Sequence, residues 1–109
     1  MDFLTYQNLA KTTAKYPNIG NNFVYPALGL SSEAGEVAGK IKKVLRDDNG
    51  VVSEEKKQAI KDELGDVLWY IAQLATELKL PLDEIAENNV LKLKSRLDRG
   101  VITGEGDKR

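Results

Sequence analysis

The sequence predicts an all-α fold, a four-helix bundle, because four stretches repeat apolar residues at helical spacing and helix breakers separate them. The breakers are the asparagine-rich segment 16–22, the turn 47–50 and Pro81. A chain of 109 residues suits one domain of ordinary size. We therefore expect a single all-α domain over residues 1–98, followed by a mobile C-terminal tail over residues 99–109, where glycines are frequent and apolar side chains few.

Capping residues mark where the helices begin. Asp2 and Ser53 are suitable N-cap residues for the first and third helices, because their side-chain oxygens accept hydrogen bonds from free backbone N–H groups. Glu54 and Glu55 follow directly after Ser53, and their negative charges interact favourably with the positive end of the helix dipole. Pro81 then marks the break before the fourth helix. The four expected helices span about residues 2–15, 25–46, 54–79 and 82–98.

The composition excludes several classes of protein. The 16 basic and 17 acidic residues nearly cancel, so we expect no nucleic-acid partner and no binding to an anionic membrane. The absence of cysteine and histidine removes disulfides, thiolate metal sites, the commonest zinc ligand and the usual general base. Any bound metal should therefore be a hard, oxygen-binding cation. No stretch is long enough to span a bilayer and no leader pattern is visible, so the expected location is cytoplasmic.

An acid–glycine–acid pattern occurs twice in the chain. Glu33 and Glu36 stand three residues apart, and Glu63 and Asp66 repeat this spacing in the next helix. Acids at i and i+3 share a helix face, and both pairs flank the apolar arc of their helix at similar angles. Two such helices lying side by side would bring the four carboxylates together. We call Glu33, Glu36, Glu63 and Asp66 the four acids, and they are the candidate metal ligands and catalytic residues.

For one such pair alone, a solvated helix face is the ordinary interpretation in a chain that is 30% charged. Two features favour a site. Gly35 and Gly65 each cost about 0.8 to 1 kcal/mol against alanine inside a helix, which predicts close helix packing beside the acids. Two carboxylates about 4 Å apart repel by roughly 4 kcal/mol at an effective dielectric constant near 20, so a cluster needs a cation. Oxygen-only ligands favour Mg²⁺, with Mn²⁺ as a substitute, and substrate phosphates commonly complete the coordination of Mg²⁺.

The fourth helix carries a matching set of hydrogen-bond donors. Asn89, Lys92 and Arg96 follow one another at helical spacing and form a stripe, the donor stripe, which suits a phosphate chain. The alternative interpretation is a surface face whose long side chains extend into solvent. Tyr70 stands one turn after Asp66, where its hydroxyl would reach a metal-bound water or a phosphate. The alternative interpretation is a half-buried ring whose hydroxyl contacts solvent.

The third helix is apolar on two sides. Opposite its main apolar arc it carries Trp69, Ala72 and Thr76, and a helix that is apolar on two sides is usually buried on both. A four-helix chain of this size covers one side well. The second side therefore predicts a partner subunit, most simply in a twofold dimer with Trp69 at the contact.

These motifs resemble those of the MazG-like nucleoside triphosphate pyrophosphohydrolases of the all-α NTP pyrophosphatase superfamily. The family signature, Glu-x-x-Glu followed after a spacer by Glu-x-x-Asp, is matched by the four acids, and the resemblance extends over most of residues 26–96. It implies a MazG-like bundle completed by dimerisation, as a homodimer or a dimer of dimers. It also implies that the four acids bind Mg²⁺, that the donor stripe holds the triphosphate and that Tyr70 stands near it.

The reaction implied by the resemblance is cleavage of a (d)NTP between the α- and β-phosphates, which yields a (d)NMP and pyrophosphate, as in the housecleaning of nucleotide pools. Bound Mg²⁺ would orient a water for in-line attack, so no histidine is needed. Other hypotheses are a phosphoribosyl-ATP pyrophosphatase, a dUTPase-like activity, and a non-catalytic dimeric helical binding module. The sequence leaves open the preferred base and sugar, the number of metal ions and the carboxylate that acts as general base.

Overall fold

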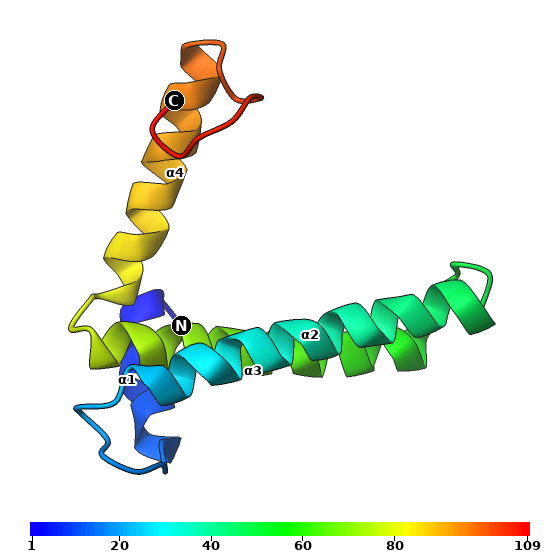
Figure 1. Ribbon diagram of the computed structural model, residues 1–109, viewed down its shortest axis with the longest axis horizontal. Helices are drawn as coiled ribbons and strands as arrows, with labels where there is room; N and C mark the ends of the chain where they lie inside the picture. The colour runs from blue at the N-terminus through cyan, green and yellow to red at the C-terminus, as the bar shows by residue number, and fades with distance from the viewer.

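The computed structural model describes all residues from Met1 to Arg109 and confirms the all-α fold. A long hairpin of two neighbouring helices forms the body of the molecule, a short helix crosses one end of it, and the last helix projects away from that end (Figure 1). The elements are α1 (Phe3–Ala10), the 3₁₀ helix η1 (Lys11–Thr13), α2 (Val24–Asp47), α3 (Glu54–Glu77) and α4 (Leu82–Asp98).

The first helix is shorter than predicted and ends as a 3₁₀ turn. The hydroxyls of Thr12 and Thr13 donate hydrogen bonds back to the carbonyls of Leu9 and Ala10, at 2.6 and 3.0 Å. Such bonds to the i−3 carbonyl compete with the α-helical pattern and tighten the last turn. The prediction that the helix continues to residue 15 was therefore wrong. The chain turns at Ala14 and enters the asparagine-rich loop.

Both predicted N-caps are confirmed. The Asp2 carboxylate accepts a hydrogen bond from the Thr5 N–H at 2.7 Å, and the Ser53 hydroxyl accepts one from the Lys56 N–H at 3.1 Å. At its other end α3 stops two residues before the predicted Lys79, which adopts a left-handed conformation with φ of 59°. The N–H groups of the two residues after the cap then bond the carbonyls of Thr76 and Ala75, a Schellman motif.

A buried glutamine joins α1 to the corner between α3 and α4. The Gln7 side chain donates to the Leu80 carbonyl at 2.9 Å and to the Thr76 hydroxyl at 3.2 Å, and accepts from the Leu82 N–H at 2.8 Å. Around this point Ala10, Ala72 and Leu82 form the apolar core. The amide thereby satisfies backbone groups that the turn leaves free, and it fixes where α4 begins.

The same packing corrects the prediction about the second apolar side of α3. The side of α3 that carries Trp69, Ala72 and Thr76 packs against α1 and η1 of the same chain, with Ala72 fully buried and Trp69 partly buried. The Trp69 indole N–H donates to the Ala10 carbonyl at 3.1 Å and to the Thr13 hydroxyl at 2.9 Å. The inference of a partner from this face was therefore wrong.

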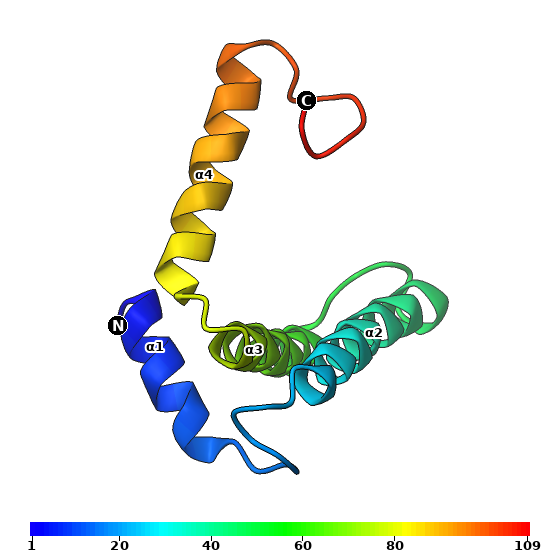
Figure 2. The same ribbon diagram turned by 60° about the vertical axis from the view of Figure 1, so that its left-hand side comes forward.

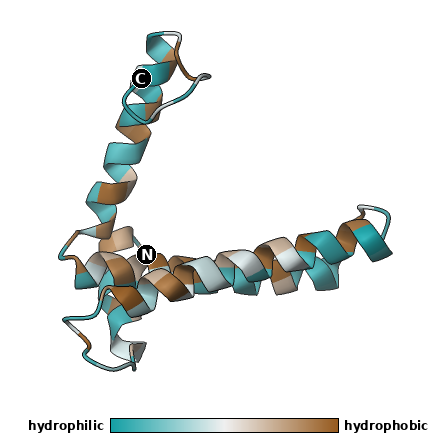
Figure 3. Ribbon diagram, viewed as in Figure 1, coloured by the Kyte–Doolittle hydropathy of each residue, from teal (hydrophilic) through white to brown (hydrophobic).

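The single chain does not close into a compact bundle. Helix α4 contacts α1 at its base and then extends away from the α2–α3 hairpin, as the turned view shows (Figure 2). Only ten of the 109 residues are buried, far fewer than a compact domain of this length needs. Apolar residues also recur along the projecting helix (Figure 3). No helix combines the length and apolar character that crossing a membrane requires.

Candidate functional site

Three of the four acids meet across the hairpin. Glu33 of α2 and Glu63 and Asp66 of α3 each offer a carboxylate oxygen, and these three oxygens lie within 4.8 Å of one another. The antiparallel pairing of the two helices brings them together, as the repeated spacing predicts. Glu36, one turn further along α2, is exposed and does not belong to the group. Its role as a ligand stays a prediction.

The electrostatics of this acidic cluster fit a divalent cation. One carboxylate oxygen of Glu63, Oε2, is buried and has no hydrogen-bond partner, while Oε1 lies 4.0 Å from the Lys40 ammonium. A hydrogen-bonding contact with the Glu63 carboxyl raises the pKa of Glu33, and burial and the neighbouring carboxylates add to the rise. Buried polar atoms are normally satisfied, so the free Glu63 oxygen marks a place for a ligand. Hard carboxylate oxygens are the donors that Mg²⁺ and Mn²⁺ take.

The glycines beside the acids do not mark close packing within the chain. A Cβ added at Gly35 or Gly65 would meet nothing within 4 Å, so the interpretation drawn from them was wrong. The glycine that packs is Gly29, one turn before Glu33, because a Cβ there would overlap the ring of Tyr70. This close approach seats Tyr70 against α2 beside the acidic cluster.

Tyr70 belongs to an aromatic cluster that leads from the loop to the acids. Its ring lies 6.5 Å from that of Tyr25, which stacks on Tyr16 at 4.6 Å. Burial, chiefly, raises the pKa of Tyr70, and the nearby Tyr25 hydroxyl and acidic side chains act in the same direction. The Tyr70 hydroxyl therefore stays protonated and able to donate a hydrogen bond beside the acids.

Sequence reasoning missed Glu77, which anchors this aromatic cluster. Its carboxylate accepts hydrogen bonds from the Tyr16 hydroxyl and from the N–H groups of Gly20 and Asn22, the latter two at 2.9 and 3.1 Å. Burial works to raise the pKa of Glu77, but these bonds prevail and hold it below its usual range. An acid in the last turn of a helix opposes the helix dipole, and that unfavourable position was the available signal.

A cleft opens beside the acidic cluster. It has a volume of about 320 Å³ and is lined by Thr13, Glu33, Asp66, Trp69 and Tyr70. Two of these five residues are acids of the cluster, and two are aromatic. The cleft therefore connects the acids with the end of η1 and with the aromatic residues of α3.

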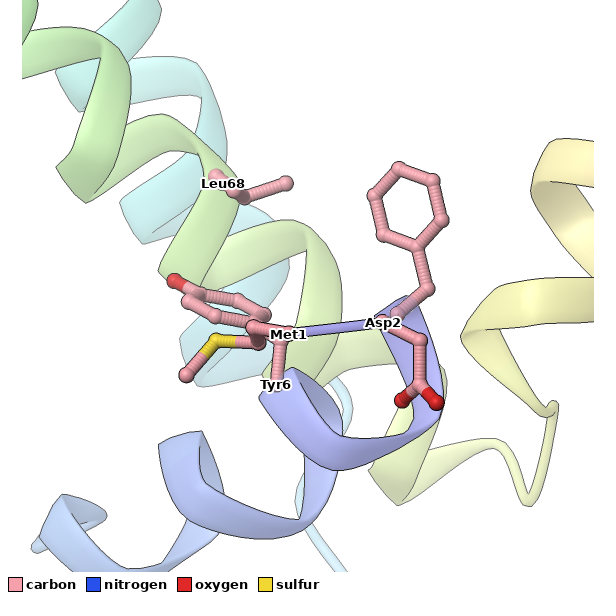
Figure 4. A pocket seen from close by; sticks show the side chains of 5 residues that line it. Met1, Asp2, Tyr6 and Leu68 are labelled. Atoms are coloured by element: carbon pink, nitrogen blue, oxygen red, sulfur yellow. The ribbon is translucent and has the colours of Figure 1, made fainter.

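A second cavity, of about 340 Å³, lies at the start of α1 and is apolar. Met1, Asp2, Phe3, Tyr6 and Leu68 line it. Figure 4 shows the Met1 side chain beside the Tyr6 ring, Leu68 above them, and the Asp2 carboxylate turned away. This cavity contains none of the three acids of the cluster.

The donor stripe lies on the projecting helix, and the structure does not bring it to the acids of the same chain. Asn89 is exposed. The Lys92 ammonium and the Arg96 guanidinium both bond the Asp107 carboxylate, at 2.9 and 3.1 Å, and Arg96 also bonds the Asp107 carbonyl. The two cations predicted to bind phosphate thus already hold an anion, which the C-terminal tail supplies.

A family model described as the MazG nucleotide pyrophosphohydrolase domain matches residues 26–101, well over half of the chain. The chain belongs to the MazG family. A relative, the Gene 37 protein of Mycobacterium phage L5, is 48% identical over an alignment of 109 positions that covers 95% of this chain and 96% of that protein. No solved structure matched.

The MazG match contains all four acids, Tyr70 and the donor stripe, and it confirms the predicted family. Membership indicates a nucleotide pyrophosphohydrolase, and the acidic cluster agrees with the divalent metal that such enzymes use. The match begins after α1 and η1, so Gln7 and Thr13 lie outside the MazG domain that it defines. The similarity to the phage protein extends through nearly the whole chain.

Proposed function

We propose that the chain is a Mg²⁺-dependent pyrophosphohydrolase that cleaves a (d)NTP between the α- and β-phosphates to a (d)NMP and pyrophosphate. The observation that carries the proposal is the meeting of Glu33, Glu63 and Asp66 around a buried Glu63 oxygen without a hydrogen-bond partner. When bound there, Mg²⁺ neutralises phosphate charge and lowers the pKa of water.

The side chains around the cluster have separate roles in metal binding, proton transfer and phosphate binding. The carboxylates hold the cation, and one of the acids takes the proton of the attacking water. The Tyr70 hydroxyl, which stays protonated, donates a hydrogen bond to a phosphate or to that water. The Lys40 ammonium, 4.0 Å from Glu63, offsets part of the negative charge while the site holds no substrate. The donor stripe binds the outer phosphates by charge-assisted hydrogen bonds.

The donor stripe reaches the acids in a homodimer, or in a dimer of dimers. Within one chain α4 points away from the hairpin, so the α4 of a second subunit has to supply the stripe. The exposed apolar residues of α4 support this arrangement, because a helix in water does not normally present so many. They are Ile85, Val90, Leu91, Leu93 and Leu97. The apolar cavity at the start of α1 is a second surface that a partner would cover.

The first experiment is an assay of pyrophosphate release with and without Mg²⁺. The panel contains the common dNTPs and NTPs, dUTP, dUDP and phosphoribosyl-ATP, so that related activities are detected. Glu63→Gln should lower turnover by about a hundredfold or more, because metal binding supplies several kcal/mol of transition-state stabilisation. Glu54→Gln is the matched control, since Glu54 lies on the same helix in an exposed pair with Lys57. Undiminished turnover in Glu63→Gln would refute the proposal.

Thermal melting separates the enzyme from a non-catalytic helical module. Millimolar Mg²⁺ should raise the Tm of the wild type by several degrees, because a ligand that binds only the folded state stabilises it. The rise should disappear in Glu63→Gln and persist in Glu54→Gln. A wild-type Tm that does not respond to Mg²⁺ would favour the binding module.

A further inference from the structure

We propose that Trp69 is the platform on which the nucleobase of the substrate stacks, and that the cleft of Thr13, Trp69 and Tyr70 holds the nucleoside. This inference rests on the proposed function, because it takes the phosphates to lie at the acidic cluster. It concerns residues of α3 and η1 that the repeated acid motif does not include.

The position of the cleft is the first argument. Glu33 and Asp66 belong both to the acidic cluster and to the wall of the cleft, so the two sites are continuous. A nucleotide whose phosphates contact the acids therefore places its sugar and base in the cleft. The volume of about 320 Å³ lies at the lower end of the range for small-molecule sites, which suits a nucleoside.

The fixed orientation of the indole is the second argument. The Trp69 N–H donates to the Ala10 carbonyl and the Thr13 hydroxyl, and the ring of Tyr70 meets the indole edge to face at 5.0 Å with an interplanar angle of 89°. These contacts hold the ring before any ligand binds, which lowers the entropy lost on binding. An aromatic ring held beside a phosphate site is well suited to stacking on a base.

The polar groups of the cleft indicate how the nucleobase is recognised. The Thr13 hydroxyl donates to the Ala10 carbonyl and accepts from the Trp69 indole, so both of its roles are already used inside the protein. The indole N–H is likewise occupied. Around Thr13 and Trp69 the cleft therefore offers a stacking surface and no free side-chain donor for a base edge, and the hydroxyl of Tyr70, the remaining donor of the cleft, is assigned to the phosphates or the attacking water in the proposed function. Stacking tolerates every base, so the cleft should accept purine and pyrimidine nucleotides alike.

The chain contains a single tryptophan and four tyrosines, so fluorescence excited at the red edge of the absorption, where tyrosine does not absorb, reports on Trp69 alone. In the presence of Mg²⁺, α,β-methylene analogues of dATP and dTTP, which cannot be hydrolysed between these phosphates, should both change the emission in a saturable way. Inorganic triphosphate is the control, and it should bind without the same change. Equal responses to inorganic triphosphate and to the nucleotide analogues, or no response to either analogue, would overturn the proposal.

Substitution gives a second readout. Trp69→Leu should raise the KM for dATP and dTTP by about tenfold to a hundredfold with a much smaller change in kcat, since stacking contributes to binding. Trp69→Phe keeps an aromatic face and should recover most of the affinity, and Tm values establish that both variants are folded. An unchanged KM in Trp69→Leu would contradict the stacking of the base on Trp69, and it would leave the proposed function intact. If the wild type hydrolyses no nucleotide, the proposed function fails, and the fluorescence titration still decides the role of Trp69.

Discussion

At the scale of single residues, the two acids of a pair leave their helix in different directions. Acids three apart differ by about 60° in direction on an α-helix, so a neighbouring helix can approach one of them more closely than the other. On α3 the difference is accommodated, since Glu63 and Asp66 both reach the acidic cluster. On α2 it leaves Glu33 in the cluster and Glu36 exposed. Helical spacing predicts which residues share a face, and the packing of the two helices decides which of them meet.

Gly29→Ala should destabilise the protein by about 1 to 3 kcal/mol, because the added Cβ overlaps the Tyr70 ring and an overpacked site must displace it. The displaced hydroxyl should also reduce turnover. Urea denaturation measures the first effect, and the pyrophosphate assay the second.

Gly65→Ala is the control, since nothing lies within 4 Å of its added Cβ, and it should stabilise the helix by about 0.5 to 1 kcal/mol. A Gly29→Ala variant as stable as the wild type would contradict the packing. A loss of stability in Gly65→Ala would place a partner's backbone against that face.

At the scale of elements, the three long helices follow from the sequence because their apolar periodicity, caps and breakers agree. The span of α4 was predicted without error, and those of α2 and α3 within two residues. The end of helix α1 could not be predicted in this way, because threonine hydroxyls bond its last carbonyls and the last turn is a 3₁₀ turn. Nor does any local pattern show that Gln7 bonds residues more than 70 positions away. Contacts between distant elements fixed the position of α4, and they carry no sequence signal in one chain.

Asp107→Asn should lower the KM for the nucleotide by about twofold to fivefold, since an exposed ion pair such as Lys92–Asp107 contributes about 0.2 to 1 kcal/mol, and the buried Arg96 still has the Asp107 carbonyl as a partner. The Asp107 carboxylate forms ion pairs with Lys92 and Arg96, so in the proposed function a substrate phosphate has to displace it. The hydrogen bond from Lys92, and next that from Arg96, also lower the pKa of Asp107. Its carboxyl group is therefore ionised at neutral pH. Steady-state kinetics at constant ionic strength measure the effect.

The matched control for Asp107 is Glu105→Gln, which removes another exposed acid of the tail and should leave KM unchanged. A KM in Asp107→Asn equal to or above that of the wild type would mean that the tail does not compete with substrate. The extent of residues 99–109 as a separate mobile tail remains a prediction.

At the scale of the whole molecule, the open shape is the main feature that helical periodicity did not foresee. The apolar side of α3 that indicated a partner is covered by α1, whereas the apolar face of α4 is free. Periodicity shows that a face needs cover but not which element covers it. The acidic cluster was predictable because two adjacent helices carry it. The relation of the donor stripe to that cluster was not, because it depends on the packing of α4, which extends away from the α2–α3 hairpin.

A mixture of two defective variants tests whether one subunit completes the site of the other. Glu63→Gln removes an acid and Lys92→Ala a stripe cation, so each homodimer is impaired in both of its sites. If α4 crosses to the partner, half of the dimers formed by unfolding and refolding the two chains together are mixed, and each has one intact site. The mixture should therefore recover about a quarter of the wild-type activity.

If each chain instead builds its own site, every site in the mixture carries one defect and no activity is recovered. Refolded wild type sets the reference for recovery, and a refolded mixture of Glu63→Gln with Asp66→Asn is the negative control. Both of these defects lie on α3, so a mixed dimer contains no intact set of acids whichever way α4 runs. Activity in that control equal to the test mixture would contradict a shared site, whereas activity in the test mixture alone requires α4 of one chain to lie beside the acids of another.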